Sequence, residues 1–312
     1  MPSIYDYNLI TEFTTKGAGL SRWAFAEKNG RKYFIKEFLK PVYPTSADNL
    51  TPELEERRRK KCLKFYNERI LFYEELKKCR TGNNVVVEEF FRFGGRYYVV
   101  SDKVKKSDIS IQEVAALPDD KKRVLCSSIL YSIKELHSHG IVHADIKPDN
   151  ILLKRTANGY ITAKIIDFDS SFFATEIPEE VNGDFVYLAP ETFLRMSQEA
   201  GEIRGKADVF SLGLLFHQYY TGELPEFEDG CTYAFEAVLS GAELSVSDRL
   251  PPYMKQLITD MLRADPEERL SSSEAFARLR AAEPFEDTAV SCIPPAADVV
   301  NPQPKNIMYE IL

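Results

Sequence analysis

The sequence predicts an α+β fold in two parts, a small strand-rich N-terminal part with one long helix and a larger, mainly helical C-terminal part. Aromatic and β-branched runs at 23–26 and 32–38 flank an Asn29-Gly30 turn, and similar runs flank Gly94-Gly95, which is typical of β-hairpins. From residue 110 onward apolar residues recur at helical spacing, most clearly over 124–139. A chain of 312 residues, 44% of them hydrophobic, can bury one large core or two smaller ones.

Composition and charge argue against several classes of protein. A net charge of −8 disfavours nucleic acid or an anionic membrane surface as the main partner. The basic run 57–61 stands among Glu53, Glu55 and Glu56, so we interpret it as a solvated helix face. No run of about 18 apolar residues indicates a membrane span, and the five cysteines are scattered without a C-x-x-C pair. Because this cysteine usage is typical of a reducing compartment, we expect a cytoplasmic protein.

The long helix of the N-terminal part is expected to start at Thr51, a capping hydroxyl followed by proline and an acid, and to end at about residue 80. Glu68 lies between Phe65 and Phe72 at helical spacing, which predicts that it shares their inward apolar face. A glutamate on an inward face needs a cationic partner, and we expect that partner to be Lys36. Two later glutamates are the rivals for this role and are expected to face solvent: Glu74 and Glu75.

Eight residues at 143–150 concentrate the chemistry of the chain. They read His-Ala-Asp-Ile-Lys-Pro-Asp-Asn and lead directly into an apolar run, which predicts a loop that enters a buried strand. The Asp145 carboxylate can accept a proton, the Lys147 ammonium can neutralise a phosphoryl oxygen, and the Asn150 carboxamide can bind a divalent cation. Phosphoryl transfer needs these groups, because its catalysis consists mostly of positioning and charge stabilisation. A polar turn before a strand is the alternative interpretation.

The loop at 143–150 resembles the H-R-D-L-x-x-x-x-N catalytic loop of the protein kinases. Other segments resemble motifs of the same family in the same order: 167–169 (Asp-Phe-Asp) resembles D-F-G, 189–191 reads Ala-Pro-Glu, and 207–213 is similar to the central helix of the larger lobe. The resemblance implies a bilobal protein kinase-like fold of the α+β class. Its parts are a small β-rich N-lobe with the αC helix at 1–101, a larger and mainly helical C-lobe at 102–283, and a proline-rich tail at 284–312.

The resemblance also implies a role for each matching residue. Asp145 would be the catalytic base, Lys147 would steady the γ-phosphoryl group, and Asn150 and Asp167 would hold Mg²⁺. The residues implied in ATP binding are Gly17 and Gly19 in a phosphate-covering loop, Lys36 on the phosphates with Glu68 as its partner, Ala24 and Leu152 beside the base, Asp102 and Val104 through their backbones, and Asp108 at the ribose. Asp208 would hold the backbone of the catalytic loop, and Arg269 would pair with Glu191.

Four residues depart from the family pattern: Arg22, Phe34, Ala144 and Asp169. Arg22 replaces the third glycine of the phosphate-covering loop and is expected to contact the phosphates instead. Phe34 replaces a small residue, so together with the small Ala24 it suggests either an adenine roof repacked at similar volume or an occluded pocket. Asp169 replaces the glycine of D-F-G and adds a second acid near the metal carboxylate. These departures keep open the alternative of a pseudokinase scaffold, which would bind nucleotide or a partner without phosphoryl transfer.

The expected substrate is a protein with a Ser or Thr acceptor. Small-molecule kinases lack the Ala-Pro-Glu, central-helix and late-arginine motifs found here, and Lys147 is typical of Ser/Thr kinases rather than tyrosine kinases. Acids at 223–229, with Asp149 and Asp108, favour substrates that are basic near the acceptor. A solvated acidic loop on an acidic protein is the alternative, and Gln218 favours it because basophilic relatives often have an acid there.

Activation by loop phosphorylation is not expected. Kinases regulated in this way gather the phosphate with an arginine beside the catalytic aspartate, and here that position is Ala144. A new phosphate on the hydroxyls between 167 and 191 would therefore have no arginine there to pair with. Those hydroxyls belong to Ser170, Ser171 and Thr175.

Overall fold

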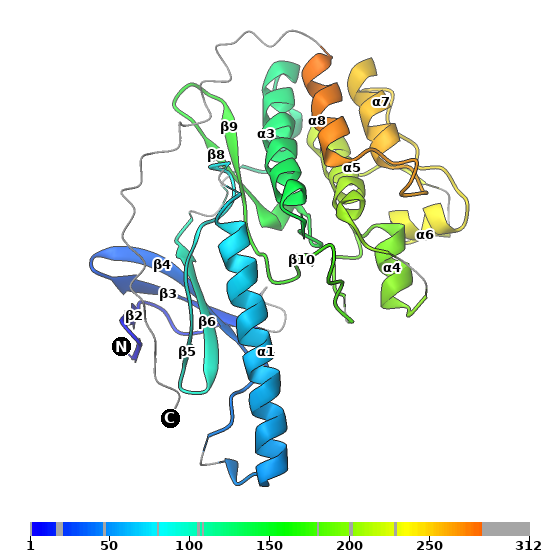
Figure 1. Ribbon diagram of the computed structural model, residues 1–312. Helices are drawn as coiled ribbons and strands as arrows, with labels where there is room; N and C mark the ends of the chain where they lie inside the picture. Colours follow the sequence, from blue (N-terminus) through cyan, green and yellow to red (C-terminus); the bar gives the residue numbers. More distant parts are fainter. Residues whose placement is uncertain are drawn as a thin grey trace.

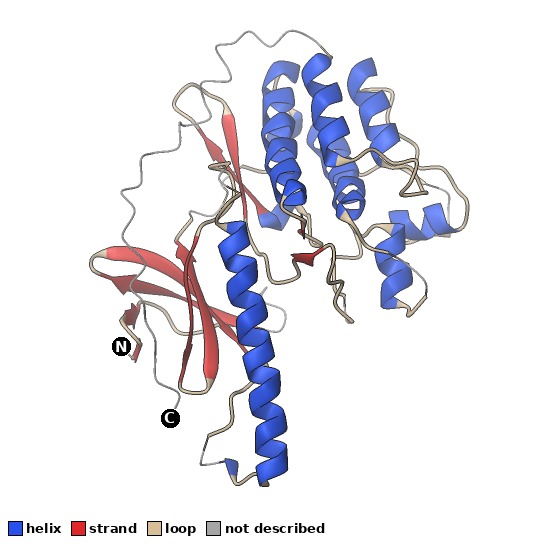
Figure 2. Ribbon diagram, viewed as in Figure 1, coloured by secondary structure: helices blue, strands red, loops and turns tan. Residues whose placement is uncertain are grey.

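The computed structural model describes residues 2–16, 21–45, 48–79, 81–104, 107, 109–179, 181–199, 202–227 and 230–282. Within these residues the chain forms two lobes, a curved sheet flanked by one long helix and a larger lobe built mostly of helices (Figures 1 and 2). The predicted α+β, bilobal architecture is therefore confirmed. The predictions for Gly17, Gly19, Asp108 and the tail at 284–312 lie outside the described residues.

The N-lobe sheet has six strands in the order β1-β2-β3-β4-β6-β5, each antiparallel to its neighbours. Asn29 and Gly30 both have positive φ, 52° and 75°, which confirms the predicted tight hairpin between β3 and β4. The strands are β1 Ser3–Ile4, β2 Tyr7–Leu9, β3 Ser21–Lys28, β4 Arg31–Phe38, β5 Val87–Phe93 and β6 Arg96–Asp102.

The register of the sheet decides which side chains face the cleft between the lobes. Lys36 of β4 lies directly opposite Trp23 of β3 and Val99 of β6, so these three share one face. Ile35 lies opposite Ala24 and shares the other face with it. Residues of that other face form a small core together with residues of the first two strands: Ile4, Tyr7, Leu9, Ala24, Ala26, Ile35, Tyr98 and Val100.

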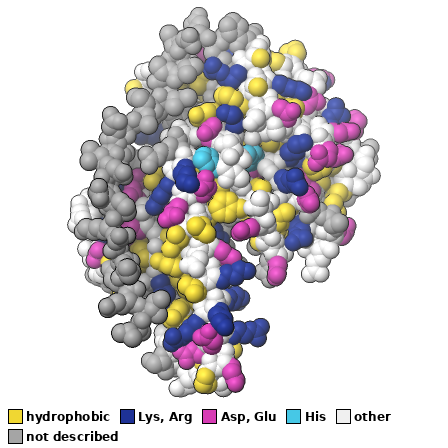
Figure 3. Space-filling model, in the orientation of Figure 1, with side chains coloured by type: hydrophobic (Ala, Val, Ile, Leu, Met, Phe, Trp, Pro, Cys, Tyr) yellow, Lys and Arg dark blue, Asp and Glu magenta, His cyan; other side chains and the backbone are white. Residues whose placement is uncertain are grey.

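Helix α1 (Pro52–Leu76) begins as predicted, because Thr51 caps it by accepting a hydrogen bond from the Leu54 N–H. It ends at Leu76, earlier than the sequence indicated. From Cys62 onward one face of the helix packs into the large core, where Cys62, Phe72, Tyr73 and Leu76 are buried. Its N-terminal half extends past the sheet (Figure 1), and Lys and Arg side chains lie along it on the surface (Figure 3), so the basic run 57–61 is the solvated face that the sequence predicted.

The C-lobe is organised around α5 (Gly205–Thr221), in which nearly every residue is buried. Gly213 of α5 lets another segment approach closely, since a Cβ there would lie 2.8 Å from the Leu262 side chain. The other C-lobe helices are α2 Ile111–Ala115, α3 Asp119–Ser138, α4 Pro190–Met196, α6 Ala234–Leu239, α7 Pro252–Met261 and α8 Ser272–Ala281. Among the described helices, none has the length and apolar content that crossing a membrane requires.

Short strands bring two loops of the C-lobe together. Strand β7 (Ile141–Val142) pairs with β10 (Phe172–Phe173), and β8 (Ile151–Arg155) pairs with β9 (Ile161–Ile165). The loop 143–150 joins β7 to β8, and the segment 166–171 joins β9 to β10. Because both loops connect the same two strand pairs, they lie side by side, and Asp167 of the second loop contacts Lys36 of the N-lobe sheet, where the candidate site is built.

Candidate active site

A buried carboxylate holds the loop 143–150 in place. Asp208 of α5 is 1% exposed and accepts hydrogen bonds from the backbone N–H groups of His143 and Ala144, both at 2.8 Å. Ala144 has a φ of 64°, in the left-handed region that residues with a Cβ seldom adopt. These hydrogen bonds stabilise that turn and so set the direction of the next residue, Asp145. The role predicted for Asp208 is confirmed.

Asp208 is itself fixed by a histidine of α3. His137 Nε2 lies 2.9 Å from Asp208 Oδ2, and His137 Nδ1 lies 2.8 Å from Ser272 Oγ. Gly205 permits this arrangement, because a Cβ there would lie 2.7 Å from the imidazole. Burial raises the pKa of Asp208, but the hydrogen bond from His137 and its neighbours outweigh burial, so the net pKa is lowered. Asp208 is therefore ionised at neutral pH, the form that accepts every one of these hydrogen bonds.

Asp145 is held between a cation and an amide. Lys147 Nζ lies 2.9 Å from Asp145 Oδ2, and Asn150 Nδ2 donates to the same oxygen at 2.8 Å and to the Asp145 backbone oxygen at 2.7 Å. Burial lowers the pKa of Lys147, but the hydrogen bond to Asp145 and the charge of Asp145 outweigh burial. The net pKa is raised, so the ammonium stays charged. The structure thus brings together the three loop residues that the sequence singled out. Their arrangement orients the two carboxylate oxygens of Asp145 and places the positive charge of Lys147 beside them.

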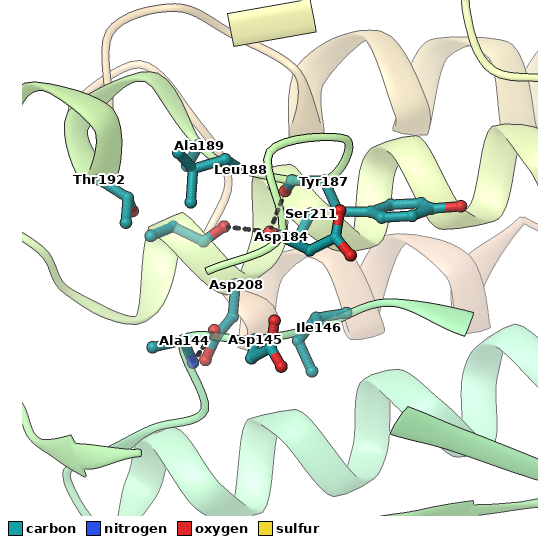
Figure 4. A pocket seen from close by; sticks show the side chains of 11 residues that line it. Ala144, Asp145, Ile146, Asp184, Tyr187, Leu188, Ala189, Thr192, Asp208 and Ser211 are labelled. Carbon is teal, nitrogen blue, oxygen red and sulfur yellow. Dashed lines mark hydrogen bonds between the residues drawn. The ribbon is translucent and has the colours of Figure 1, made fainter. Parts of the chain in front are cut away.

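A second acid, Asp184, lines a small pocket together with Asp145 (Figure 4). Asp184 Oδ2 lies 3.7 Å from Lys147 Nζ. The pocket lies between the loop 143–150 and the segment 184–192, with Asp208 and Ser211 of α5 behind it (Figure 4). Ser211 fixes the segment by donating a hydrogen bond to the Tyr187 backbone oxygen at 2.7 Å. The segment 184–192 is thereby held against α5, beside the loop 143–150.

The N-lobe contributes one buried cation to the site. Lys36 has a side chain that is 7% exposed, and its Nζ lies 2.9 Å from Asp167 Oδ1 and 2.7 Å from Asp169 Oδ2. Burial lowers the pKa of Lys36, but the charges of Asp169 and Asp167 outweigh burial and raise it, so Lys36 is charged. Burial raises the pKa of Asp167, yet the nearby Lys36 lowers it overall. For Asp169 burial dominates, and the pKa is raised despite Lys36.

The prediction that Glu68 is the partner of Lys36 is wrong. Glu68 points away from the sheet, its side chain is 51% exposed, and its nearest cation is Lys64 of the same helix at 3.7 Å. Arg69 takes the inward position instead, and its Nη2 donates a hydrogen bond to the Asp169 backbone oxygen at 3.0 Å. The reason is geometric: successive helix residues are about 100° apart, so Glu68 lies at the edge of the apolar face and Arg69 at its centre. The spacing of Cys62, Phe72 and Leu76, buried on that face, was the signal that identifies Arg69.

Two predictions for β3 are also wrong, by one residue. Ala24 is fully buried on the face of the sheet away from Lys36, and Arg22 pairs with Glu37 there at 2.9 and 3.0 Å rather than facing the phosphate site. Because strand side chains alternate, a slip of one residue moves every side chain to the other face. Counting by two from the Lys36–Trp23 pair would have found Trp23 and Phe25 on the cleft face.

Aromatic rings therefore form the roof of the cleft. Phe34 stacks on Trp23 with centroids 5.4 Å apart and contacts Phe25 edge-on at 6.2 Å. Lys103 Nζ lies 3.8 Å from the centroid of the Phe25 ring, at the exit of β6. The prediction of a roof repacked at similar volume is wrong, since Ala24 makes no room for Phe34. This face of the sheet instead carries three aromatic rings packed against one another, and the alternative of an occluded pocket stays a prediction.

The edge of the cleft holds the remaining predicted contacts of the base. Asp102 ends β6, and its side chain is engaged by Arg31, which leaves its backbone for any ligand contact. Val104 packs at the border of the large core, and Leu152 of β8 is half-buried between the buried Ile151 and Leu153. The contacts of these three residues with a base stay predictions.

A buried ion pair fixes the far side of the C-lobe, as predicted. Arg269 donates to both carboxylate oxygens of Glu191, at 2.6 and 3.1 Å, and also to the backbone oxygens of Arg263, Lys206 and Ala264. The Arg269 side chain is fully buried, and a fork-to-fork pair of this kind is among the stronger protein hydrogen bonds. It ties the start of α4, and with it the segment 184–192, to the base of the lobe.

Comparison with known proteins identifies the family. Residues 53–279 match the family model described as protein kinase domain, which is well over half of the chain. The chain belongs to the protein kinase domain family. The matched range starts within α1, so β1 to β4 and Lys36 lie outside it, and the assignment of Lys36 rests on the geometry above.

Similar proteins agree with this family. The serine/threonine-protein kinase ULK3 of Xenopus laevis is 27% identical over 186 residues, covering 58% of this chain and 39% of that protein. The serine/threonine-protein kinase RAD53 of Saccharomyces cerevisiae is 25% identical over 291 residues, covering 87% of this chain and 32% of that protein. A crystal structure of Rad53 residues 1–466 in complex with AMP-PNP has a TM-score of 0.60 at 22% identity, covering 88% of this chain and 64% of that one. The chain thus spans about a third of the length of these curated relatives and shares the kinase fold.

Proposed function

We propose that this chain is an ATP- and Mg²⁺-dependent protein kinase that transfers the γ-phosphoryl group to Ser or Thr hydroxyls of proteins. One observation carries the proposal: Asp145, oriented by Lys147 and Asn150, lies on the loop beside the segment whose Asp167 contacts Lys36. Base, phosphate-binding cations and metal carboxylate therefore meet where the two lobes face each other. Curated relatives named as serine/threonine-protein kinases support the same conclusion.

The side chains at the site fit a Mg²⁺ ion. Mg²⁺ prefers oxygen ligands and is usually bound through one or two carboxylates together with substrate phosphates. Asp167 offers an ionised carboxylate, and Asn150, whose Nδ2 donates to Asp145, keeps its Oδ1 as the remaining polar atom. Asp167 and Asn150 would hold the ion, which when bound neutralises charge on the phosphates.

Each residue then has a task in the transfer. Asp145 accepts the proton of the acceptor hydroxyl and orients it, and its carboxylate is already fixed from two sides. Lys147, charged and next to Asp145, stabilises negative charge that develops on the transferred group. Lys36 holds the other phosphates from the N-lobe, and the rings of Trp23, Phe25 and Phe34 exclude water and stack on the base.

The substrate preference is a finer part of the proposal. Asp149, within the loop 143–150, is exposed, which supports a preference for basic residues near the acceptor. Glu223 already pairs with Arg249 at 2.6 Å, which reduces its field, and 228–229 and Asp108 lie outside the described residues. A peptide array at low salt tests the preference: enrichment of Arg or Lys at a flanking position supports it, and no enrichment refutes it. The free thiols of Cys62, Cys79, Cys126 and Cys231 support a reducing, cytoplasmic location.

A labelling assay tests the proposal. It measures the transfer of label from γ-labelled ATP, in the presence of Mg²⁺, to a mixture of peptides that carry Ser, Thr and Tyr. Lys36→Met and Asp167→Asn should each lower the rate by about a thousandfold or more, which is about 4 kcal/mol of barrier. Asp248→Asn, at a side chain 95% exposed, is the matched control and should transfer at the wild-type rate. Label should appear on Ser or Thr. Label on Tyr alone contradicts the role of Lys147. Transfer at the wild-type rate by both variants would show that the transfer does not come from this site, and the alternative of a pseudokinase scaffold would then stand.

A further inference from the structure

We propose that Asp169 supplies the carboxylate that positions Lys36, and that Arg69 of α1 clamps the segment 167–169 that carries it. The pairing partner of the phosphate-binding lysine would then lie in the same segment as the metal carboxylate, rather than on helix α1. The inference rests on the proposed function for its meaning in catalysis, and its geometry stands independently.

The contacts of Lys36 show why Asp169 is the partner. A buried ammonium needs a compensating charge, and Asp169 Oδ2 is the nearest carboxylate oxygen at 2.7 Å. Asp167 Oδ1 is also close, at 2.9 Å, but Asp167 is the carboxylate that a metal would engage. Asp169 is then the acid that stays with Lys36. Ser21 Oγ, 3.5 Å from Asp169 Oδ2, lies on the same side of the carboxylate.

Helix α1 contributes a cation to this cluster. Arg69 donates to the Asp169 backbone oxygen at 3.0 Å, and its guanidinium lies 5.7 to 5.9 Å from the ring centroids of Phe38, Phe65 and Phe72. These rings fix the guanidinium between the sheet and the segment 167–169. A glutamate at this position would place a third acid beside Asp167 and Asp169. With Arg69 present the cluster holds two cations, Lys36 and Arg69, against two carboxylates.

The arrangement changes which movement would disable the site. An ion pair to a helix glutamate breaks when the helix rotates away. Here the Lys36 pair depends on the segment 167–169, so a displacement of that segment removes the lysine partner and the metal carboxylate together. Control of this kinase domain would therefore act through the segment that Arg69 holds, and the outward Glu68 has no part in it.

The experiment measures binding of a fluorescent, non-hydrolysable ATP analogue with Mg²⁺ to the full chain and to three variants. Asp169→Asn should weaken binding by tenfold or more, and Asp169→Glu, which keeps the charge, should restore it to within threefold. Glu68→Gln, the matched change on α1, should bind within twofold of wild type. A positioning role also predicts that KM for a peptide substrate changes by less than twofold. Wild-type binding by Asp169→Asn, or a tenfold loss in Glu68→Gln, overturns the inference.

A nucleotide-free measurement separates this inference from the proposed function. The melting temperature is compared for wild type, Lys36→Met, Asp169→Asn and the double variant. The effect of Asp169→Asn on the melting temperature should differ between the wild-type and the Lys36→Met backgrounds by at least about 2 °C, because the pair exists only in the first. Equal effects overturn the inference. If wild type transfers no phosphate while this difference is found, the proposed function fails and the ion pair stands.

Discussion

Replacement of Asp208 by Asn tests how the catalytic loop is held. Asp208→Asn keeps the shape of the side chain but can accept from only one of the two N–H groups, because its own NH₂ then faces the other. The change removes one hydrogen bond to a charged acceptor, worth about 1.5–3 kcal/mol, and leaves a buried N–H unpaired at about 1–3 kcal/mol. Relief of carboxylate burial offsets part of this, so we expect a net loss near the lower end, about 3 kcal/mol.

Thermal unfolding measures this loss directly. An unfolding entropy of about 2.1 cal/mol/K per residue gives about 1.5 °C per kcal/mol for a chain of 312 residues, so the melting temperature should fall by about 4–5 °C. Phosphoryl transfer by the folded variant should also drop, since the left-handed turn at Ala144 that directs Asp145 loses its support. Asp248→Asn is the exposed control and should melt within about 1 °C of wild type. A melting temperature unchanged in Asp208→Asn would refute the account of the loop.

Three other predictions follow from the same contacts. Glu191→Gln leaves Arg269 buried without its anionic partner, so unfolding in urea should show a loss of about 3–5 kcal/mol; a loss under 1 kcal/mol contradicts a structural role for the pair. The pKa of Asp208 is lowered by folding, so its carboxylate contributes stability above the unfolded pKa of about 3.9, and this stability is lost as pH falls through the folded pKa. The difference in melting temperature between wild type and Asp208→Asn should therefore shrink below about pH 4. It should stay constant from about pH 5 to 8. Combined Ser170→Ala and Thr175→Ala should leave transfer within a few-fold of wild type in a kinetic assay, because Ala144 provides no guanidinium for a loop phosphate, and a hundredfold loss would contradict this.

The C-lobe half of the site could be predicted from the sequence because its chemistry is local. Asp145, Lys147 and Asn150 lie within one short loop, so their proximity does not depend on long-range register. Asp208 and the Glu191–Arg269 pair were predicted from the resemblance to the protein kinase motifs, which indicates the partner of each, and the hydrogen bonds confirm both.

The N-lobe half was predicted less well, for a geometric reason. A strand changes face at every residue and a helix turns about 100° per residue, so a shift of one position moves a side chain out of the site. That shift explains why the predictions for Ala24 and Arg22 in β3 and for Glu68 in α1 were wrong. The contact between Asp169 and Lys36 joins residues far apart in the chain, and the acid at 169 indicated only that an extra charge was present.

Single-turnover transfer by Asp145→Asn tests the central claim, that this site performs phosphoryl transfer, most directly. The variant keeps the size of the side chain but cannot accept the hydroxyl proton, while Lys36, Asp167 and the aromatic roof are untouched. The account predicts that Asp145→Asn binds the fluorescent ATP analogue within about threefold of wild type and transfers the γ-phosphoryl group at least about a thousandfold more slowly. Transfer at the wild-type rate, or no transfer by the wild type itself under saturating ATP and Mg²⁺, would contradict it.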